Sequence, residues 1–210
     1  NKSDLSFSTK VGQLNQNQSQ QESFFKNINY YVLKDSRPQL HLDASEVSVN
    51  NTSSKTLFFD PKGTVFSKNQ DRINFQGMKG SYYQKRSLLH ISRNVKMKVV
   101  KNSSILTSNE VLYKINMGRM DARGNVKTRS VSKVSGDKIL IDADRAISWT
   151  KMNETKYFGN VNGKVIRRRV YEDPVLFKSN KLYLKMDDHL ISLSGNVELR
   201  KQSFKANARR

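Results

Sequence analysis

Gly195-Asn196-Val197-Glu198 is the last of four nearly identical phrases in a chain of 210 residues. The earlier copies are Arg93-Asn94-Val95-Lys96, Gly124-Asn125-Val126-Lys127 and Gly159-Asn160-Val161. The asparagines of successive copies lie 31, 35 and 36 positions apart, and Asp60-Pro61-Lys62-Gly63-Thr64-Val65 looks like a degenerate earlier copy. Repeats of this period are typical of stacked supersecondary units, each of which needs its neighbours to bury an apolar face. The chain is therefore internally repeated.

A second phrase keeps a fixed distance from the first. Sixteen residues before three of the four asparagines, a small or polar pair precedes an apolar alternation. The copies are Ser108-Asn109-Glu110-Val111, Ala143-Asp144-Arg145-Ala146 and Ser179-Asn180-Lys181-Leu182, with Gly77-Met78 as a weaker copy before Asn94. Gly and Asn favour chain reversals. We therefore interpret each repeat as two strands of about 6 to 8 residues that are joined by a hairpin turn, as at Asn116-Met117-Gly118, and that end in a second turn at the Gly-Asn phrase.

The apolar residues of each repeat recur at every second position. Leu182 and Leu184 share one parity, and Lys181 and Lys185 share the other. A period of two is the pattern of a strand with one buried face, and no convincing stretch has the period of a helix. The sequence therefore predicts an all-β fold, elongated and antiparallel, built from hairpin repeats.

The repeat also predicts the domain organisation. Because one pattern runs from about residue 40 to 199, a single domain is favoured over two. We expect residues 1–22, rich in Asn, Gln and Ser, to be a flexible arm, residues 23–202 to be the β domain, and residues 203–210 to be a basic tail. The chain begins at Asn1 and not at Met, which suggests that a leader or an anchor has been removed.

The net charge of +20 predicts attraction to polyanions such as anionic lipid head groups, phosphorylated glycolipid or nucleic acid. Many of the lysines are also explained as a solvated outer face that protects strand edges. The densest basic run contains Lys164, Arg167, Arg168 and Arg169. Nucleic-acid modules usually add exposed sheet aromatics or a recognisable signature. Neither is evident here, so nucleic acid is not an expected partner.

Catalysis and metal binding are not predicted. His41, His90 and His189 lie in different repeats without a second ligand at metal-binding spacing, and cysteine is absent. Asp142 and Asp144 imitate a carboxylate pair, but Asp144 occupies the place that Asn109 and Asn180 hold in other repeats. We expect no cofactor and no enzymatic activity. A binding or bridging function is what remains.

The repeats resemble those of the periplasmic lipopolysaccharide-transport proteins of the OstA-like group, which includes LptA, LptC and the N-terminal part of LptD. The resemblance rests on Leu193-Ser194-Gly195-Asn196-Val197 and its variant Ala122-Arg123-Gly124-Asn125-Val126. The segment from Leu40 to Val47, followed by Pro61-Lys62-Gly63-Thr64-Val65, is similar to the opening of an LptC-type domain. Arg93, in place of the repeated glycine, departs from the pattern.

The resemblance implies a fold, a cargo and a set of partners. Members of the group form a twisted open β-jellyroll whose apolar groove accepts the acyl chains of lipopolysaccharide, and they join edge to edge across the periplasm. LptC types are held to the inner membrane by an N-terminal helix and receive lipid from an ABC transporter. We therefore expect a periplasmic, LptC-like, lipid-bridging protein whose inner-membrane anchor lies outside this chain.

The strand parity and the resemblance together give candidate site residues. The predicted lipid-binding groove consists of Val111, Tyr113, Ile139, Ile141, Leu182, Leu184, Leu193 and Val197. The predicted basic rim consists of Lys164, Arg167, Arg168 and Arg169. The last strand, expected at about Ile191 to Lys201, carries the predicted partner edge of Ile191, Leu193, Val197 and Leu199, which would recruit an LptA-like protein. The first strands, expected near 28–33 and 40–49, would face the transporter.

Two alternatives from other classes stay open. One is a structural or adhesive β-repeat protein of the cell surface with a sealed core and no lipid cargo. The other is a basic nucleic-acid-binding protein. An open cleft between the strands would favour lipid transport over both.

Overall fold

The computed structural model describes residues 7–8, 22–50, 54–66, 72–101, 103–132, 135–169, 171–188, 190–202 and 204–208. The N-terminal half contains β1 (Phe7–Ser8), β2 (Glu22–Lys34), β3 (Arg37–Asn50), β4 (Lys55–Phe59), β5 (Lys62–Phe66), β6 (Arg72–Gln76), β7 (Lys79–Tyr83), the 3-10 turn η1 (Gln84–Arg86) and β8 (Leu88–Val99). The C-terminal half contains β9 (Ser104–Lys114), the 3-10 turn η2 (Ile115–Met117), β10 (Arg119–Val131), β11 (Lys138–Trp149), β12 (Glu154–Ile166), β13 (Val175–Lys185), β14 (Leu190–Ser194), β15 (Val197–Lys201) and β16 (Phe204–Ala208).

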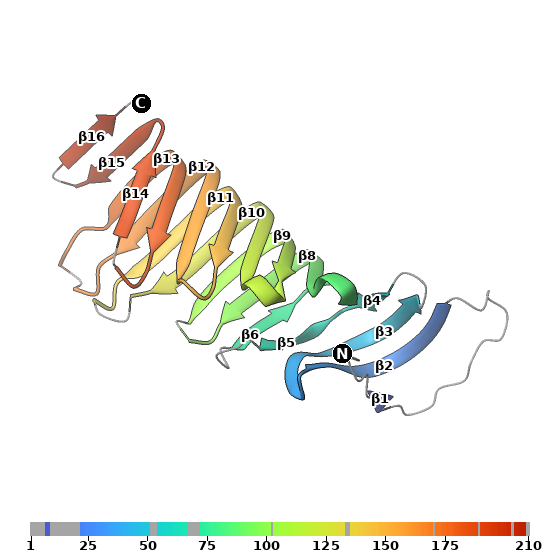
Figure 1. The fold of residues 1–210 in the computed structure, drawn as a ribbon. Helices are drawn as coiled ribbons and strands as arrows, with labels where there is room; N and C mark the ends of the chain where they lie inside the picture. The colour runs from blue at the N-terminus through green and yellow to red at the C-terminus, as the bar shows by residue number, and fades with distance from the viewer. Residues whose placement is uncertain are drawn as a thin grey trace.

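All of these strands belong to one antiparallel sheet of 16 strands, which follows the chain along an elongated body (Figure 1). From β8 to β13 each strand is hydrogen-bonded to the strands that precede and follow it in sequence. The predicted elongated all-β architecture is confirmed.

Three of the four Gly-Asn phrases lie inside long strands and the fourth lies between β14 and β15, so their interpretation as the turns that end each repeat is wrong. The hairpin expected at Asn116-Met117-Gly118 does join β9 to β10. β8, β10 and β12 are 12, 13 and 13 residues long, and each contains one phrase. Both residues of every phrase have positive φ, for example 70° at Gly124 and 50° at Asn125, and the register shifts there. Two left-handed residues in succession form a bulge that bends a strand. Sequence alone does not distinguish a bulge from a turn, because both need a residue that tolerates positive φ.

The phrase sixteen residues upstream lies directly across the sheet from each bulge. Asn160 Nδ2 donates to Asp144 Oδ2 at 2.9 Å, and the N–H of Asn180 donates to the carbonyl of Gly195 at 2.7 Å. A Cβ at Gly124 would lie 2.7 Å from Asn109 Nδ2. Glycine is therefore favoured at this position both by its φ and by the approach of the neighbouring strand. We call this line of bends the corner row: Met78, Arg93, Asn94, Asn109, Gly124, Asn125, Asp144, Gly159, Asn160, Asn180, Gly195 and Asn196.

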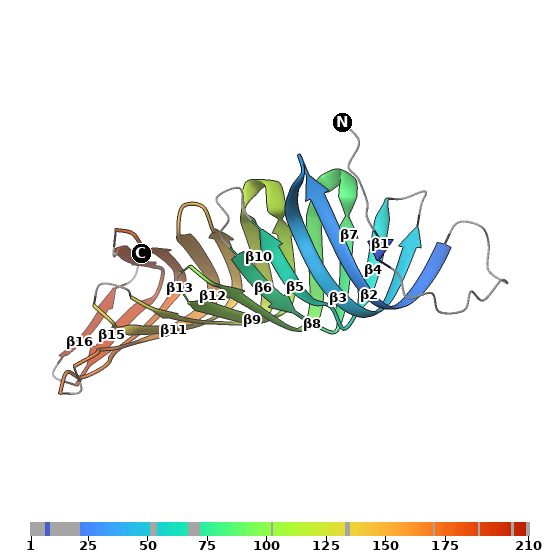
Figure 2. The same ribbon diagram turned by 90° about the horizontal axis from the view of Figure 1, so that it is seen from below.

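The corner row divides the sheet into two layers that face each other (Figure 2). Layer A contains β4, β7, β14 and residues 22–26, 46–50, 88–92, 110–114, 119–123, 145–149, 154–158 and 181–185. Layer B contains β5, β6, β15, β16 and residues 28–34, 37–44, 95–99, 104–108, 126–131, 138–143, 161–166 and 175–179. Each long strand thus contributes one half to each layer.

The core lies between the two layers and is built from the residues of one parity. Its largest fully buried side chains include Tyr82, Tyr113, Tyr157 and Phe58. Ring centroids of Tyr30 in layer B and Phe58 in layer A lie 5.2 Å apart in an edge-to-face arrangement. The residues of the other parity point to solvent from the outer face of each layer.

The two ends of the sheet differ from the expectation. Residues 204–208, assigned to a basic tail, form β16, which pairs with β15 from Val197↔Ala208 to Lys201↔Phe204. The last strand is therefore β16. Near the other end, β1 of the predicted arm pairs with β2 through Phe7↔Tyr30 and Ser8↔Asn29. Within the described part of the chain, layer A ends on β14 and layer B ends on β16, each with one unpaired edge.

Candidate functional site

A narrow cleft of about 60 Å³ opens between the two layers in the C-terminal half of the body. Layer B contributes residues of β8, β9 and β10, and layer A contributes residues from β10 to β13 and from the turn after β11. The lining side chains are Met97, Val99, Ser104, Leu106, Met120, Thr128, Ser130, Ser148, Thr150, Asn153, Thr155, Tyr157, Leu184 and Met186. The long strands that bend at the corner row bring these residues together from positions far apart in sequence.

The apolar part of the lining carries the chemistry of an alkyl-binding surface. Met97, Leu106, Met120 and Leu184 are each at most 8% exposed. Methionine side chains adapt their shape to irregular partners, and each CH₂ group transferred from water to such a surface contributes about 0.8 kcal/mol. The apolar part of the lining therefore has the chemistry to contact a short piece of a hydrocarbon chain.

Hydroxyl groups form the polar part of the lining. Thr150 Oγ1 donates to the carbonyl of Gly118 at 3.0 Å, and Thr155 Oγ1 donates to Ser148 Oγ at 3.0 Å. Ser130 Oγ is buried and has no hydrogen-bond partner among the described residues. The Ser130 hydroxyl can therefore donate to an ester or amide carbonyl that enters with a lipid chain.

Tyr157 lies at the boundary between these two parts. Burial raises the pKa of the Tyr157 phenol to about 12, although hydrogen bonds with Thr128 and Thr155 act in the opposite direction. The phenol is therefore neutral at physiological pH. None of the described residues that line the cleft is a Lys, Arg, Asp or Glu.

The predicted groove residues face the interior, but most of them do not line the cleft. Val111, Tyr113, Ile139, Ile141, Leu182 and Leu184 are between 1% and 7% exposed. Leu184 is the only one of the eight predicted residues in the cleft lining. Val111, Tyr113, Ile139, Ile141 and Leu182 belong to the buried core, and Leu193 packs against it. Contact of these residues with lipid stays a prediction.

At the C-terminal end the inner face is uncovered. Ile191 is 37% exposed and Phe204 is 57% exposed, although both pair with inward-facing positions of the neighbouring strands. Leu193 and Leu199 are only partly buried. Of the predicted partner edge, Ile191 and Leu193 lie on β14 with its unpaired edge, whereas Val197 and Leu199 lie on β15 between β13 and β16.

The predicted basic rim is not a free cationic cluster. Arg167 Nη1 lies 2.8 Å from Asp137 Oδ2, and Arg169 Nη1 lies 3.6 Å from Glu172 Oε1. The backbone N–H of Arg168 is the main cause of the lowered pKa of Asp137, and Arg167 adds to it. Lys164 points away from the cleft, because its neighbour Val165 packs against the core. Sequence reasoning missed Asp137 because it lies just before β11, 30 residues from Arg167.

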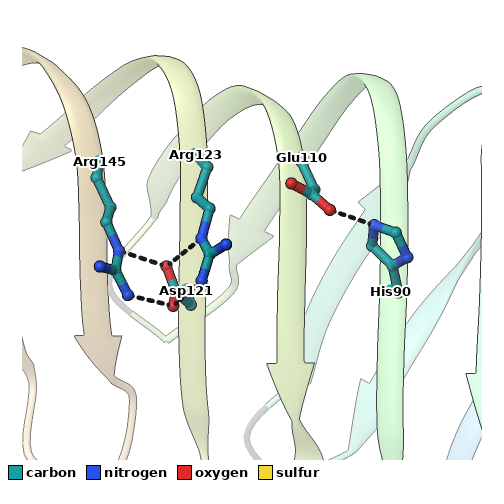
Figure 3. Close-up of polar contacts among 5 residues, drawn as sticks. All are labelled: His90, Glu110, Asp121, Arg123 and Arg145. Atoms are coloured by element: carbon teal, nitrogen blue, oxygen red, sulfur yellow. Dashed lines mark hydrogen bonds and ion pairs between the residues drawn. The ribbon is translucent and has the colours of Figure 1, made fainter.

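The outer face of layer A carries further ion pairs, which Figure 3 shows. Asp121 accepts from Arg145 at 2.6 Å and from Arg123 at 3.1 Å, and His90 Nε2 lies 2.7 Å from Glu110 Oε1 (Figure 3). Burial acts to raise the pKa of Asp121, but the hydrogen bonds from Arg145 and Arg123 outweigh it and lower the pKa. These contacts connect neighbouring strands and neutralise charge on this face.

An open antiparallel sheet, bent along one line into two layers with a cleft between them, is the architecture of a β-jellyroll. The model of the LptC-related lipopolysaccharide-assembly family matches residues 4–139 of the chain. The chain belongs to this family. A role in lipopolysaccharide transport follows from the membership, and the family consists of periplasmic transport and bridge proteins.

The chain is also similar to a solved structure. LptH from Pseudomonas aeruginosa, described as the LptA-homologous periplasmic component of the lipopolysaccharide transport device, matches with a TM-score of 0.49 and 14% identity. The match covers 58% of this chain and 81% of LptH. No curated protein gives a significant match.

Two further features bear on the site. No helix formed by the described residues has the length and apolar composition needed to cross a membrane. Among the same residues, no group of three or more His, Asp and Glu side chains is arranged to hold a metal ion. His189 lies outside the described residues.

Proposed function

We propose that the chain binds the acyl chains of lipopolysaccharide between layers A and B and passes them along a periplasmic bridge. The observation that carries this proposal is the apolar, hydroxyl-rimmed cleft between two layers, in a chain of the lipopolysaccharide-assembly family. In a sealed structural core, side chains would fill such a cleft. The structural and the nucleic-acid alternatives are therefore less favoured.

The volume of the cleft implies a movement. At about 60 Å³, it holds only a short piece of an alkyl chain, so binding of a whole chain requires the layers to separate. The long strands connect the layers only along the corner row. On the opposite side the hairpin turns join strands of the same layer, so the layers can part there without breaking the sheet.

A polar bridge between the layers lies near the N-terminal end. Gln39 of β3 in layer B donates through Nε2 to Asn116 Oδ1 of η2 at 3.1 Å and accepts from the hydroxyl of Tyr82 in β7 at 3.3 Å. Gln39 is 8% exposed, so its bond with Tyr82 is buried, whereas its bond with Asn116 is partly buried. We infer that this bridge holds the N-terminal section closed while the section beyond it opens for the acyl chain.

Photo-crosslinking at paired neighbours tests the cargo and its place. A photo-reactive amino acid at Leu106 or Leu184, which line the cleft, should capture lipopolysaccharide. The same amino acid at the adjacent Thr107 or Lys185, which have the opposite strand parity, should not. Equal capture at both members of a pair contradicts the proposal, because it indicates surface adhesion.

We also propose a polarity for the bridge, with an LptA-like protein at the C-terminal end and the inner-membrane ABC transporter at the N-terminal end. The unpaired edges of β14 and β16 and the uncovered inner face beside them support the first part. An added strand would satisfy the edge by main-chain hydrogen bonds and extend the apolar face.

Two truncations distinguish the roles of the unpaired edges of β14 and β16 in partner binding. Removal of residues 204–210 eliminates β16 and leaves β14 in place, whereas removal of residues 190–210 eliminates both. The longer truncation should abolish capture of the LptA-like partner in a pull-down while transporter association persists. Unchanged partner capture by the longer truncation refutes the polarity. Proline at Ser192 or Ser194 of β14 should act in the same direction, because proline cannot donate to an added strand.

A further inference from the structure

The outer face of layer B carries one unbroken row of residues that faces away from the cleft. Each residue is directly opposite the next across the sheet, from β8 to β16. We call it the outer row: Lys98, Ile105, Arg129, Leu140, Lys164, Leu176, Arg200 and Lys205. From β8 to β15, cations and aliphatic side chains alternate from strand to strand.

The row points outward because its sequence neighbours point inward. Met97 and Leu106 are 1% and 8% exposed and line the cleft, and Ile139 is 7% exposed in the core. Leu176, in contrast, is 45% exposed. The outer row is therefore on the opposite side of layer B from the proposed cargo.

The cations of this face are largely unneutralised. The outward positions of layer B hold Lys62, Lys96, Lys98, Lys127, Arg129, Lys138, Lys164, Lys178, Arg200 and Lys205, against the acids Asp43, Asp142 and Glu198. Arg200 pairs with Glu198 at 3.3 Å. Lys98, Arg129 and Lys164 have no ion-pair partner within the described parts of the chain.

Layer A shows the contrasting arrangement. There Asp121 binds Arg123 and Arg145, and Glu110 binds His90 (Figure 3). Arg119 and Lys156 lie over the ring of Trp149 at 5.8 and 5.6 Å from its centroid. These arginines and Lys156 of layer A are thus held by partners of their own face, whereas Lys98, Arg129 and Lys164 of the outer row are available to an external anion.

The spacing of the row fits an extended anionic surface. Neighbouring strands lie about 4.8 Å apart, so cations on alternate strands repeat at about 10 Å. The aliphatic residues between them can enter the boundary between head groups and acyl chains, while Lys and Arg extend their charged ends to phosphate. Near the N-terminal end of the same face, a hollow of about 480 Å³ is lined by His41, Thr64, Phe66, Arg72, Asn74 and Val100 and adds another cation.

We propose that the outer face of layer B docks on the surface of a bilayer that contains anionic phospholipid. Nucleic acid fits this face less well, because the positions between the cations carry Ile and Leu where a strand-binding sheet carries stacking aromatics. Docking through layer B keeps the cleft free, since the cleft is on the other side of the layer. The proposal is independent of what the cleft binds.

Vesicle co-sedimentation with matched variants tests the proposal. The probes are phosphatidylcholine vesicles with and without phosphatidylglycerol, both free of lipopolysaccharide. The outer-row variant carries Lys98→Gln, Arg129→Gln and Lys164→Gln. The control variant carries Lys79→Gln, Lys114→Gln and Lys181→Gln at exposed positions of layer A and loses the same charge.

The expected result is selective. The wild type should bind anionic vesicles at about 0.1 M salt and lose this binding near 1 M, as the screening length falls from about 10 Å to about 3 Å. Each cation near an anionic surface accounts for about five-fold in partition, so the outer-row variant should bind on the order of 100-fold more weakly. The control variant should bind nearly as the wild type does. Equal losses in both variants overturn the proposal, because they indicate attraction by net charge alone.

A fluorescence experiment reports which face meets the bilayer. Trp149 is the one tryptophan of the sequence and lies on the outer face of layer A. Its emission should not shift when anionic vesicles are added. In the double variant Leu176→Trp/Trp149→Phe, the tryptophan emission should shift to shorter wavelength when the vesicles are added. The proposal is also overturned if the emission of Trp149 shifts and that of a tryptophan at position 176 does not. A preference for DNA over vesicles that persists in the outer-row variant overturns it as well.

Discussion

Two substitutions at equivalent places of the corner row should change stability in opposite directions. Gly124 and Arg93 are the first residues of their bulges, with φ of 70° and 64°. A side chain in this left-handed region costs roughly 1–2 kcal/mol, which glycine avoids. Glycine in turn costs about 0.4–1 kcal/mol because it makes the unfolded chain more flexible. The balance therefore favours glycine at both places.

The structure gives the expected magnitudes. Gly124→Ala introduces the strain and a Cβ 2.7 Å from Asn109 Nδ2, so it should lower the free energy of unfolding by about 1–2 kcal/mol. Arg93→Gly removes the strain and should raise it by about 0.5–1 kcal/mol. In a chain of this size, 1 kcal/mol corresponds to about 2–4 °C in Tm.

Equilibrium urea unfolding, followed by far-ultraviolet circular dichroism, measures both changes. The double variant Asn109→Ala/Gly124→Ala separates the two causes, because it removes the side-chain contact and keeps the backbone strain. If Arg93→Gly destabilises the protein as much as Gly124→Ala does, the left-handed bend is not what selects glycine in the repeat, and the reasoning fails.

Two further predictions concern pH. Because the pKa of Asp121 is lowered in the folded protein, its pairing with Arg123 and Arg145 stabilises the fold above the ordinary pKa of an aspartate and is lost as the pH falls through the lowered value. Asp121→Asn should therefore flatten the acid limb of stability, measured by urea unfolding at several pH values below 5, and an unchanged limb contradicts this role. Burial raises the pKa of Tyr82 and of Tyr157 to about 12, so both phenols stabilise the fold up to about pH 10 and lose this contribution as the pH rises further. In an absorbance titration at alkaline pH, Tyr157→Phe should remove a phenol that ionises near pH 12, and loss of one that ionises near 10 would indicate an exposed Tyr157.

The sequence predicts the large-scale features of this fold for identifiable reasons. The two-residue period of Leu182 and Leu184 follows from strand geometry alone, and the structure buries both residues at 2% and 4% exposure. The constant offset of sixteen between Asp144 and Asn160 reports a real contact, because the two residues are hydrogen-bonded across neighbouring strands.

The features that sequence reasoning missed depend on register. The sequence alone predicts that the charge of Arg167 is free to bind an anion. In the folded sheet, Asp137 lies within 2.8 Å of it. The cleft also depends on register, because Met97 and Leu184 line it together only where their strands bend at the corner row. β16 was missed because its five residues include one large apolar side chain, Phe204, so the strand pattern is weak and its stability depends on pairing with β15.

The corner row also determines how a protein of this kind can change in length. Every long strand crosses both layers, so the layers behave like the two covers of a book whose spine is the line of Gly-Asn bends. Duplication of one repeat of 31 to 36 residues would insert two adjacent strands and lengthen both covers at once, by about 10 Å. The space between the covers would keep its cross-section. The reach of such a conduit is therefore set by the number of repeats, independently of the width of what it carries.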